Sequence, residues 1–266
     1  MSTEVVVSRD DGCLEIVLDK PKGNVLDRAL MAELSAALAA HAEAPDLRVV
    51  LLSAAGPHFS FGASVEEHRP ATVGPMLSAF HALIRQVAAY PVPIVVVVQG
   101  SCLGGAFELV LACHDVLVTA NASLGCPELR LGVFPPVLAV LGAQRVGGAV
   151  AERLLLTGQT LTASEAVACG LAAAIVPLES PPEDSTPAPR AEPRRSVQAY
   201  VRQYTSLSGY AVRHAVAAIR RPLVASLGAP LDEAERHYLD RLMAGSDPVE
   251  GIDAFLARRA PSWSHA

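Results

Sequence analysis

The chain has 266 residues, of which 51% are hydrophobic and 18% are charged, so it can bury one large core and is not a disordered chain. Its net charge is −6, and its basic residues form no cluster of the kind that binds nucleic acid. Its most apolar runs, such as 91–98 and 102–113, are shorter than the ~18 residues that a membrane-spanning helix needs. We therefore expect a globular protein with neither nucleic acid nor membrane as a partner.

The cysteines and the N-terminus bear on the cellular compartment. The five cysteines are widely spaced, include no Cys-x-x-Cys pair and are odd in number, which argues against a disulfide framework. The acidic N-terminus lacks the apolar stretch that is typical of a secretion signal. These features favour reduced thiols in a cytoplasmic protein. The His and Cys residues show no metal-ligand spacing, so no metal site is expected.

The first part of the chain is predicted to alternate short strands with helices. Alternating apolar residues over 5–18, on either side of an Asp-Gly turn, predict a β-hairpin. An amphipathic helix is expected after Asp27, which can act as its N-cap, and a buried strand is expected over 47–53. A long helix over 73–87 then precedes a β-branched strand over 94–98.

The next elements repeat the same order. Gly104 and Gly105 are expected to begin another helix, and 115–119 is predicted to be a strand. The repeating unit is thus strand, strand, helix, with short strands that are buried on both faces. This order predicts an α/β spiral. It does not favour a doubly wound nucleotide-binding fold, because no Gly-x-Gly-x-x-Gly motif follows a strand.

The composition changes after this α/β core, which spans 1–176. Residues 177–193 contain six prolines together with Glu, Asp and Ser, which is typical of a linker or a loop. Residues 194–266 form a C-terminal helical region. One of its helices is expected to start with Asp247 as N-cap and Glu250 three residues further on.

The C-terminal helical region keeps apolar residues at helical spacing. Among them are Val212, Val216, Ile219, Leu239, Leu242, Ile252 and Phe255. Isolated helices of this length gain little stability alone, so they must cover either the chain's own body or a neighbouring subunit. We favour a neighbouring subunit, which predicts an oligomer.

Two glutamates lie in unusually apolar surroundings. Glu108 is the only charged residue of 102–113, and Glu128 also has apolar neighbours. Desolvation raises the pKa of such a carboxyl toward neutrality, although the dipole of a helix that begins just before Glu108 favours its anion. Two carboxyls of this kind can serve as an acid and a base. The alternative is that each caps a helix, or that Glu128 pairs with Arg130.

Two tight backbone turns are the second candidate feature. Residues 62–67 are expected to start a helix, with Ser64 as the N-cap of a capping box, which would leave the Ala63 amide free to face a ligand. Gly104 and Gly105 also begin a helix and let an oxygen approach the backbone closely. Two such amides, if they converge, form an oxyanion hole.

Four segments, taken together, resemble the enoyl-CoA hydratase/isomerase (crotonase) family. They are FSFGAS (59–64), QGSCLGGAFE (99–108), LGCPELRLGVFP (124–135) and EGIDAFLARRAP (250–261). The resemblance extends over nearly the whole chain apart from the proline-rich segment. It implies a crotonase-type spiral of strand-strand-helix repeats with a C-terminal helical region that builds a homotrimer, or a homohexamer of paired trimers.

The resemblance also implies roles for individual residues. The amides of Ala63 and Gly105 would hold the thioester oxygen, and Glu108 and Glu128 would be the catalytic carboxylates. The substrate and coenzyme A would be bound by Gly62, Ser64, Gly104 and Phe134. Coenzyme A enters as part of the acyl-CoA substrate, so no separate cofactor is implied.

The two glutamates imply hydration, because family members that isomerise or decarboxylate commonly keep only one. Ser64 stands where the family usually has aspartate, and the turn after the second glutamate is bulkier and more apolar than usual. Both departures imply an altered acyl pocket. His68 and His81 are expected to be hydrogen-bonded on helix faces, since that is the commoner role of such histidines.

Residues 62–70 and 76–84 resemble the cyclohexa-1,5-diene-1-carbonyl-CoA hydratases within the family, which act in aromatic degradation. An apolar pocket would suit a six-membered ring. The expected function is therefore the addition of water to a conjugated enoyl- or dienoyl-CoA. The alternatives are an enoyl-CoA isomerase and a non-catalytic acyl-CoA-binding subunit.

Overall fold

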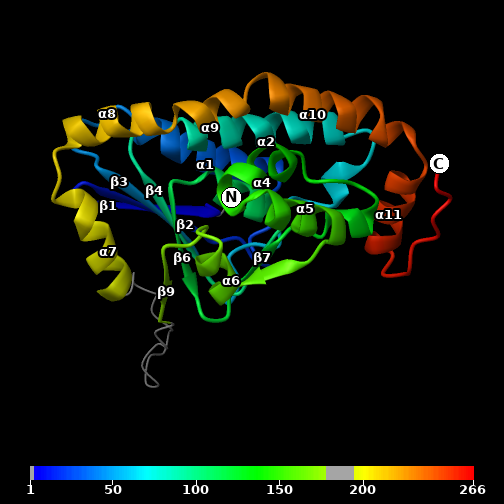
Figure 1. Ribbon diagram of the computed structural model, residues 1–266, viewed down its shortest axis with the longest axis horizontal. Coiled ribbons are helices and arrows are strands. Elements are labelled where there is room, and N and C mark those ends of the chain that lie inside the picture. The colour runs from blue at the N-terminus through cyan, green and yellow to red at the C-terminus, as the bar shows by residue number, and fades with distance from the viewer. Residues whose placement is uncertain (1–2, 178–194) are drawn as a thin grey trace.

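A sheet of mainly parallel strands forms the centre of the fold (Figure 1). The computed structural model describes residues 3–177 and 195–266, and within them this sheet has the strand order β1-β2-β3-β4-β6-β9. Its strands are β1 (Val5–Asp10), β2 (Cys13–Leu18), β3 (Val49–Ala54), β4 (Ile94–Val98), β6 (Asp115–Thr119) and β9 (Ala174–Val176). β1 and β2 pair antiparallel, which confirms the predicted hairpin, and the other neighbouring strands pair parallel.

A second, smaller sheet carries the turns that lead into the site. It has the order β5-β7-β8 and consists of β5 (Ser101–Leu103), β7 (Ser123–Gly125) and β8 (Thr160–Thr162). The chain passes from β4 in the large sheet to β5 in the small one and then into a helix, and it passes likewise from β6 to β7. This succession confirms the predicted strand-strand-helix spiral.

The helices of the α/β core pack against these sheets. They are α1 (Arg28–His41), α2 (Val73–Ala88), α3 (Gly105–Ala112), α4 (Pro136–Val146), α5 (Gly148–Thr157) and α6 (Ala163–Ala168), with the short 3-10 helices η1 (Glu66–His68) and η2 (Glu128–Leu131). α1 begins where predicted because Asp27 caps it, with Oδ1 accepting from the Leu30 N–H at 3.0 Å. α3 is buried at every position and is the central helix of the fold.

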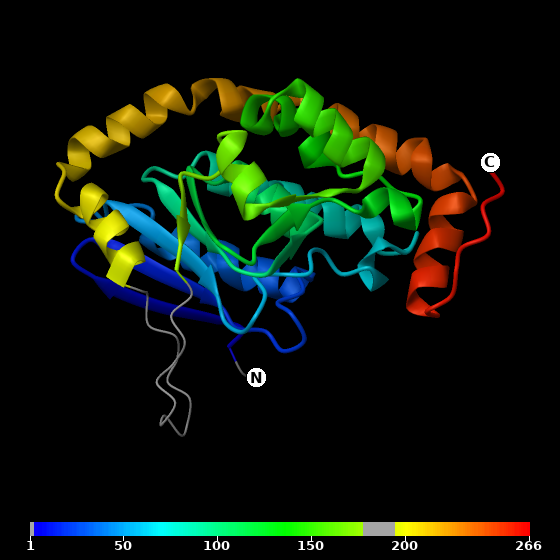
Figure 2. The ribbon, with the colours of Figure 1, turned by 60° about the horizontal axis from the view of Figure 1, so that its bottom comes forward.

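The C-terminal helical region curves along one side of the core (Figure 2). It comprises α7 (Arg195–Thr205), α8 (Gly209–Ile219), α9 (Arg221–Ser226), α10 (Ala229–Asp240), η3 (Leu242–Ala244) and α11 (Asp247–Leu256). Leu223, Leu227 and Leu231 are buried in the main core, so the region covers the chain's own body. Ile219 and Phe255 nevertheless stay 77% and 56% exposed.

The two faces of the large sheet are covered differently. The main core lies between the sheets and helices α1 to α4, and α9 and α10 close it. On the opposite face a smaller cluster joins strands β3, β4 and β6 to Val197 and Val201 of α7. Every helix within residues 3–177 and 195–266 is too short or too polar to span a lipid bilayer. The predicted proline-rich segment, apart from Pro177, lies outside the described residues.

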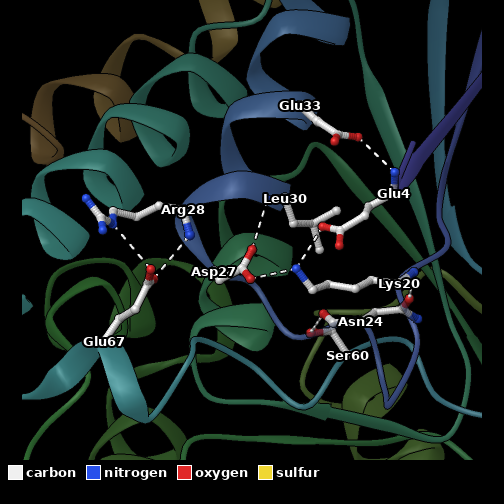
Figure 3. A network of polar contacts seen from close by, with 9 residues as sticks. All are labelled: Glu4, Lys20, Asn24, Asp27, Arg28, Leu30, Glu33, Ser60 and Glu67. Carbon is white, nitrogen blue, oxygen red and sulfur yellow. Dashed lines mark hydrogen bonds and ion pairs between the residues drawn. The ribbon is translucent and has the colours of Figure 1, made fainter. Parts of the chain in front are cut away.

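The predicted capping box at Ser64 is wrong. The N-cap position of η1 is Val65, and no side chain caps this short helix. Glu67 turns instead toward α1, where its carboxylate accepts hydrogen bonds from the backbone N–H and the Nε–H of Arg28 at 3.1 and 3.2 Å (Figure 3). These charge-assisted bonds hold the carboxylate at the start of α1, and Arg28 takes the place of the expected contact with Ser64.

The N-cap predicted for α11 is displaced by one residue. Ser246 occupies the N-cap position, and Asp247 is the first helical residue. The Asp247 carboxylate accepts hydrogen bonds from the backbone N–H groups of Ser264 and His265 at 2.8 and 3.0 Å. The C-terminal segment folds back onto the start of α11. Its N–H groups therefore bind the carboxylate that the sequence pattern had assigned to capping.

Candidate active site

A cavity of about 880 Å³ opens beside the N-terminus of α3. Its lining comes from the loop before α1, from η1, α2, α3, η2 and α4, and from α10, α11 and the segment after α11. The predicted site residues that line it are Ala63, Ser64, Gly104, Gly105, Glu108, Glu128 and Phe134. Segments far apart in the sequence are therefore brought to one cavity.

Gly62 is the one predicted site residue that does not line the cavity, and it supports the site from behind. Its φ of +95° lies in the left-handed region that favours glycine, and a Cβ there would collide with the Leu103 carbonyl oxygen. The Gly62 carbonyl accepts from the Leu26 N–H at 2.9 Å, and the Leu26 carbonyl accepts from the Ser64 N–H at 3.2 Å. These two bonds hold Ala63 between them without using its own N–H.

Polar contacts tie the loop before α1 to the segment that leads to Ala63 (Figure 3). Asn24 has a φ of +51°, and its side-chain amide donates a hydrogen bond to the Phe59 carbonyl at 3.0 Å. In return, the Ser60 hydroxyl donates to the Asn24 carbonyl at 2.7 Å. The backbone around Ala63 is therefore fixed before any ligand binds, which is what a preorganised donor requires.

The amides of Ala63 and Gly105 lie close together. A Cβ placed on Gly105 would be 3.4 Å from the Ala63 nitrogen. Gly105 is the first residue of α3, so its N–H has no partner inside the helix. Neither amide donates a backbone hydrogen bond to another element among the described residues. Two neighbouring N–H donors that face a cavity can bind one oxygen atom that gains negative charge, so they form a candidate oxyanion hole.

Glu108 lies in the first turn of α3 and is 3% exposed. Its Oε1 accepts hydrogen bonds from the backbone N–H groups of Val137 and Leu138, at 2.6 and 2.9 Å. These amides belong to the first turn of α4, so the carboxylate caps that helix. The helix-cap interpretation is thus correct for Glu108, and the side chain lines the cavity as well.

Glu128 begins η2 and reaches the same cavity. Its Oε2 is buried without a hydrogen-bond partner among the described residues, and its Oε1 would be 2.5 Å from a Cβ on Gly104. Only glycine at position 104 therefore leaves room for this carboxyl. The alternative pairing with Arg130 is not observed, since no ion pair joins them in the described part of the chain.

The two carboxyls differ in how readily they ionise. Burial raises the pKa of Glu108, and the N–H groups of Leu138 and Val137 partly lower it again. Burial also raises the pKa of Glu128, and the negative charge of Glu108 raises it further. A negative charge on either carboxyl therefore opposes ionisation of the other. Two carboxyls with raised pKa values lie at the same cavity, a setting that can support acid and base chemistry.

The remaining walls are largely apolar. Met76 and Phe80 of α2 line the cavity together with Pro135 and Pro136 at the start of α4. The Phe134 ring packs on Tyr238 of α10, with ring centroids 5.4 Å apart. The bulky apolar segment after the second glutamate thus faces the cavity, and an acyl chain or a ring without charge fits these walls best.

Basic side chains line the cavity as well, and these are Lys20, Lys22, Arg130 and Arg259. Lys20 Nζ lies 2.7 Å from Glu4 Oε2 and 2.6 Å from Asp27 Oδ2 (Figure 3). Lys22 and Arg130 form no ion pair within the described residues, so the cavity can hold an anionic group beside an apolar one. Within the described residues, no cluster of His, Cys, Asp and Glu side chains has the arrangement of a metal site.

The sequence indicated neither Tyr238 as a residue of the cavity nor the long-range partner of His81. Tyr238 lies in no motif, and only the packing of α10 brings it to the cavity. His81 is hydrogen-bonded on a helix face as expected, but its partner is Glu235, 154 residues away, with 2.5 Å between Nδ1 and Oε2. His68 also behaves as expected, because its Nδ1–H donates to the Ser64 carbonyl at 2.8 Å.

A strand-strand-helix spiral with two adjacent free amides near two buried carboxyls defines an enzyme that can polarise a carbonyl and move protons. The sequence profile of the enoyl-CoA hydratase/isomerase family matches residues 8–266. The chain belongs to this family, whose members act on acyl-CoA thioesters. The resemblance carried by the four sequence segments is therefore confirmed.

Named relatives cover nearly the whole chain. A cyclohexa-1,5-dienecarbonyl-CoA hydratase of Thauera aromatica is 40% identical over 262 residues, which are 98% of this chain and 96% of the relative. A 2,3-dehydroadipyl-CoA hydratase of Escherichia coli (strain K12) is 30% identical and covers 98% of both chains. The crystal structure of an enoyl-CoA hydratase from Mycobacterium avium subsp. paratuberculosis K-10 gives a TM-score of 0.82 at 28% identity, over 98% of each chain. The crotonase-type fold is thereby confirmed.

Proposed function

We propose that the protein adds water to a conjugated enoyl- or dienoyl-CoA thioester, with cyclohexa-1,5-diene-1-carbonyl-CoA as its substrate in aromatic degradation. The observation that carries the hydratase proposal is the pair of unlike carboxyls, Glu108 and Glu128, in one cavity with the free amides of Ala63 and Gly105. The ring substrate is supported by the apolar walls and by the 40% identity to a cyclohexa-1,5-dienecarbonyl-CoA hydratase.

The proposed reaction begins with the thioester carbonyl, whose oxygen accepts hydrogen bonds from Ala63 and Gly105. Ionised Glu108 takes a proton from water, the water oxygen bonds to the β-carbon, and the displaced π electrons move toward the carbonyl. Protonated Glu128 then gives its proton to carbon, which restores the carbonyl. Each carboxyl contributes a factor of roughly 10²–10⁴, and the resting protonation returns when the proton on Glu108 passes to Glu128 through solvent.

A ring dienoyl substrate offers a second position for the proton. Its conjugated system extends beyond the α-carbon, so Glu128 can protonate the far end of that system while the water oxygen still bonds to the β-carbon. Met76, Phe80 and Phe134 would enclose the ring. Lys22 and Arg130, which line the same cavity and form no ion pair among the described residues, would face the phosphates of coenzyme A.

The test is a substrate panel that compares crotonyl-CoA with cyclohexa-1,5-diene-1-carbonyl-CoA, followed by absorbance and by product mass. We expect both to gain one water and the ring substrate to react faster. A faster reaction of crotonyl-CoA contradicts the ring substrate. Migration of a double bond without any hydroxylated product identifies an isomerase instead, and tight binding without turnover identifies an acyl-CoA-binding subunit.

We also propose that the chain assembles into a homotrimer or a homohexamer. The support lies on the C-terminal helical region, where Tyr210 and Ile219 are each 77% exposed and Phe255 is 56% exposed. Large apolar side chains left exposed on these helices favour coverage by a neighbouring subunit. Light scattering at micromolar concentration should give the mass of three or six chains, and a stable monomer contradicts the proposal.

We further propose that the protein works in the cytoplasm. All five cysteines are free thiols, which suits a reducing compartment. Fractionation of the source cells, followed by immunodetection, should place the protein with the cytoplasmic markers, and recovery with secreted or membrane markers contradicts this location.

A further inference from the structure

Tyr238 is a buried tyrosine that the proposed reaction does not yet use. It lies on α10, is 1% exposed and lines the cavity. Its ring is fixed by contact with the Phe134 ring, with centroids 5.4 Å apart. Its hydroxyl, however, is buried without a hydrogen-bond partner among the described residues.

An unpaired buried hydroxyl is costly, because folding removes its water without a replacement. A phenylalanine would fill the same ring position without that cost. Several buried side-chain atoms share this condition in the described residues, namely His81 Nε2, His114 Nε2, Glu128 Oε2, Arg145 Nε, Ser196 Oγ and Tyr238 Oη. Of these residues, Glu128 and Tyr238 line the cavity. Both residues therefore combine a buried oxygen that lacks a partner with a place in the cavity wall.

The charges around Tyr238 determine what its hydroxyl can do. Burial raises its pKa, and the negative charges of Glu128 and Glu108 raise it further. The phenol thus stays protonated and can donate one hydrogen bond. The thioester oxygen already has two donors in the amides of Ala63 and Gly105. The oxygen atom that still needs a donor is the one that the reaction adds.

We propose that the Tyr238 hydroxyl contacts the substrate by donating a hydrogen bond to the oxygen atom that is added, first as water and then as the hydroxyl of the product. This inference rests on the proposed hydratase function. It assigns to α10 a direct part in the reaction, beside its part in covering the core. It also explains why the chain carries tyrosine where phenylalanine would pack equally well.

The test compares two ligands that differ only by a hydroxyl, cyclohex-1-ene-1-carbonyl-CoA and 6-hydroxycyclohex-1-ene-1-carbonyl-CoA. Their affinities are measured by calorimetry in a Glu108→Gln background, which blocks turnover, with and without Tyr238→Phe. We expect Tyr238→Phe to weaken binding of the hydroxylated ligand roughly five- to tenfold. Binding of the ligand without the hydroxyl should stay within about twofold, because the ring contacts are unchanged.

Tyr90→Phe is the matched control. Tyr90 is also buried, but its hydroxyl donates to the Leu38 carbonyl at 2.9 Å and lies outside the cavity. Tyr90→Phe should lower the thermal midpoint and leave both affinities unchanged. Tyr238→Phe should keep or raise the midpoint, because it removes an unpaired buried group, and in the otherwise unchanged enzyme it should lower kcat about tenfold.

Two outcomes overturn the inference. Unchanged affinity for the hydroxylated ligand shows that Tyr238 does not contact the added oxygen, and equal weakening of both ligands shows a purely structural role. The proposed hydratase function is tested separately, by turnover of the protein that carries neither substitution. An active enzyme whose Tyr238→Phe variant binds both ligands as before therefore refutes this inference alone.

Discussion

Glu108 and Glu128 are the same residue type in two different surroundings. Both are buried beside one cavity. Glu108 accepts hydrogen bonds from two backbone N–H groups of α4, whereas one oxygen of Glu128 has no partner within residues 3–177 and 195–266. Hydrogen bonds to the charged form favour ionisation, and a neighbouring negative charge opposes it. The proposed assignment of Glu108 as base and Glu128 as acid rests on these contacts, which substitutions can remove one at a time.

Glu108→Gln and Glu128→Gln should each lower kcat by at least ~10²-fold. The amide has the same shape but can neither accept nor give up the proton, so acyl-CoA affinity should change little. Steady-state kinetics and calorimetry on the folded variants measure the two effects. Glu233→Gln, at an exposed position on α10, is the control and should keep full activity. Retention of more than about a tenth of the wild-type rate would remove that glutamate from the mechanism.

Gly105→Val should abolish activity without unfolding the protein. A Cβ at this position would already lie 3.3 Å from Phe80 Cζ and 3.4 Å from the Ala63 nitrogen, so a branched side chain fills the space that the thioester oxygen needs. Circular dichroism checks the fold and the hydration assay checks the rate. Gly74→Val is the control, because a Cβ there meets nothing within 4 Å. An active, folded Gly105→Val protein would exclude the Gly105 amide as a donor.

At the scale of elements, one polar contact joins two helices that both supply cavity walls. His81 of α2 is fully buried, and its Nδ1–H donates to the Glu235 carboxylate of α10 at 2.5 Å. Burial lowers the pKa of His81, although the Glu235 charge raises it in part. The contact is thus a hydrogen bond from a neutral ring to a carboxylate, and it fixes α10 against α2.

Glu235→Ala should lower the free energy of unfolding by about 1–3 kcal/mol, because the buried ring nitrogen of His81 loses its partner. Urea denaturation followed by circular dichroism measures the change. Glu233→Ala, at an exposed position on the same helix, controls for helix propensity and should change stability by less than about 0.5 kcal/mol. Equal stability of the two variants would mean that the contact does not hold the helices together.

Elements whose signals are local were predicted well. The strand over 115–119 and the long helix from residue 73 agree with the structure, because side-chain periodicity decides which face is buried. The predicted helix caps at Ser64 and Asp247 are wrong because their signals depend on contacts that are not local. The Glu67 carboxylate binds Arg28, which is 39 residues away. This long-range contact, and not the local pattern, determines where the side chain lies. Tyr238 could not be placed at all, since its position depends on how α10 packs.

The fold as a whole buries the carboxyls of Glu108 and Glu128, and this burial makes the free energy of unfolding depend on pH. The unfolded chain loses the protons of Glu108 and Glu128 near their ordinary pKa of about 4.3. The folded chain keeps them to higher pH, because burial raises both pKa values. Between those limits the unfolded state binds fewer protons than the folded state. Stability therefore falls as pH rises through this range.

Glu128→Gln should remove one of these contributions. The variant's advantage in free energy of unfolding over the wild type should grow between about pH 5 and about pH 8, where the two states differ in protonation. Urea unfolding at a series of pH values measures it. Glu165→Gln is an informative comparison, because hydrogen bonds from Thr162 lower the pKa of that carboxyl. Its destabilising effect should vary only below about pH 5 and should stay constant between about pH 5 and about pH 8. If the difference between Glu128→Gln and the wild type stayed constant across the range, it would contradict the raised pKa of Glu128.

The cavity draws its walls from Lys20 at one end of the sequence to Pro261 at the other. Almost the whole chain must therefore be synthesised before the cavity can form. Chains released early lack Tyr238 and everything after it, so they lose one wall together with the C-terminal covering of the core. Premature termination should thus give no partly active enzyme. The activity of a cell extract should be proportional to the amount of full-length protein alone.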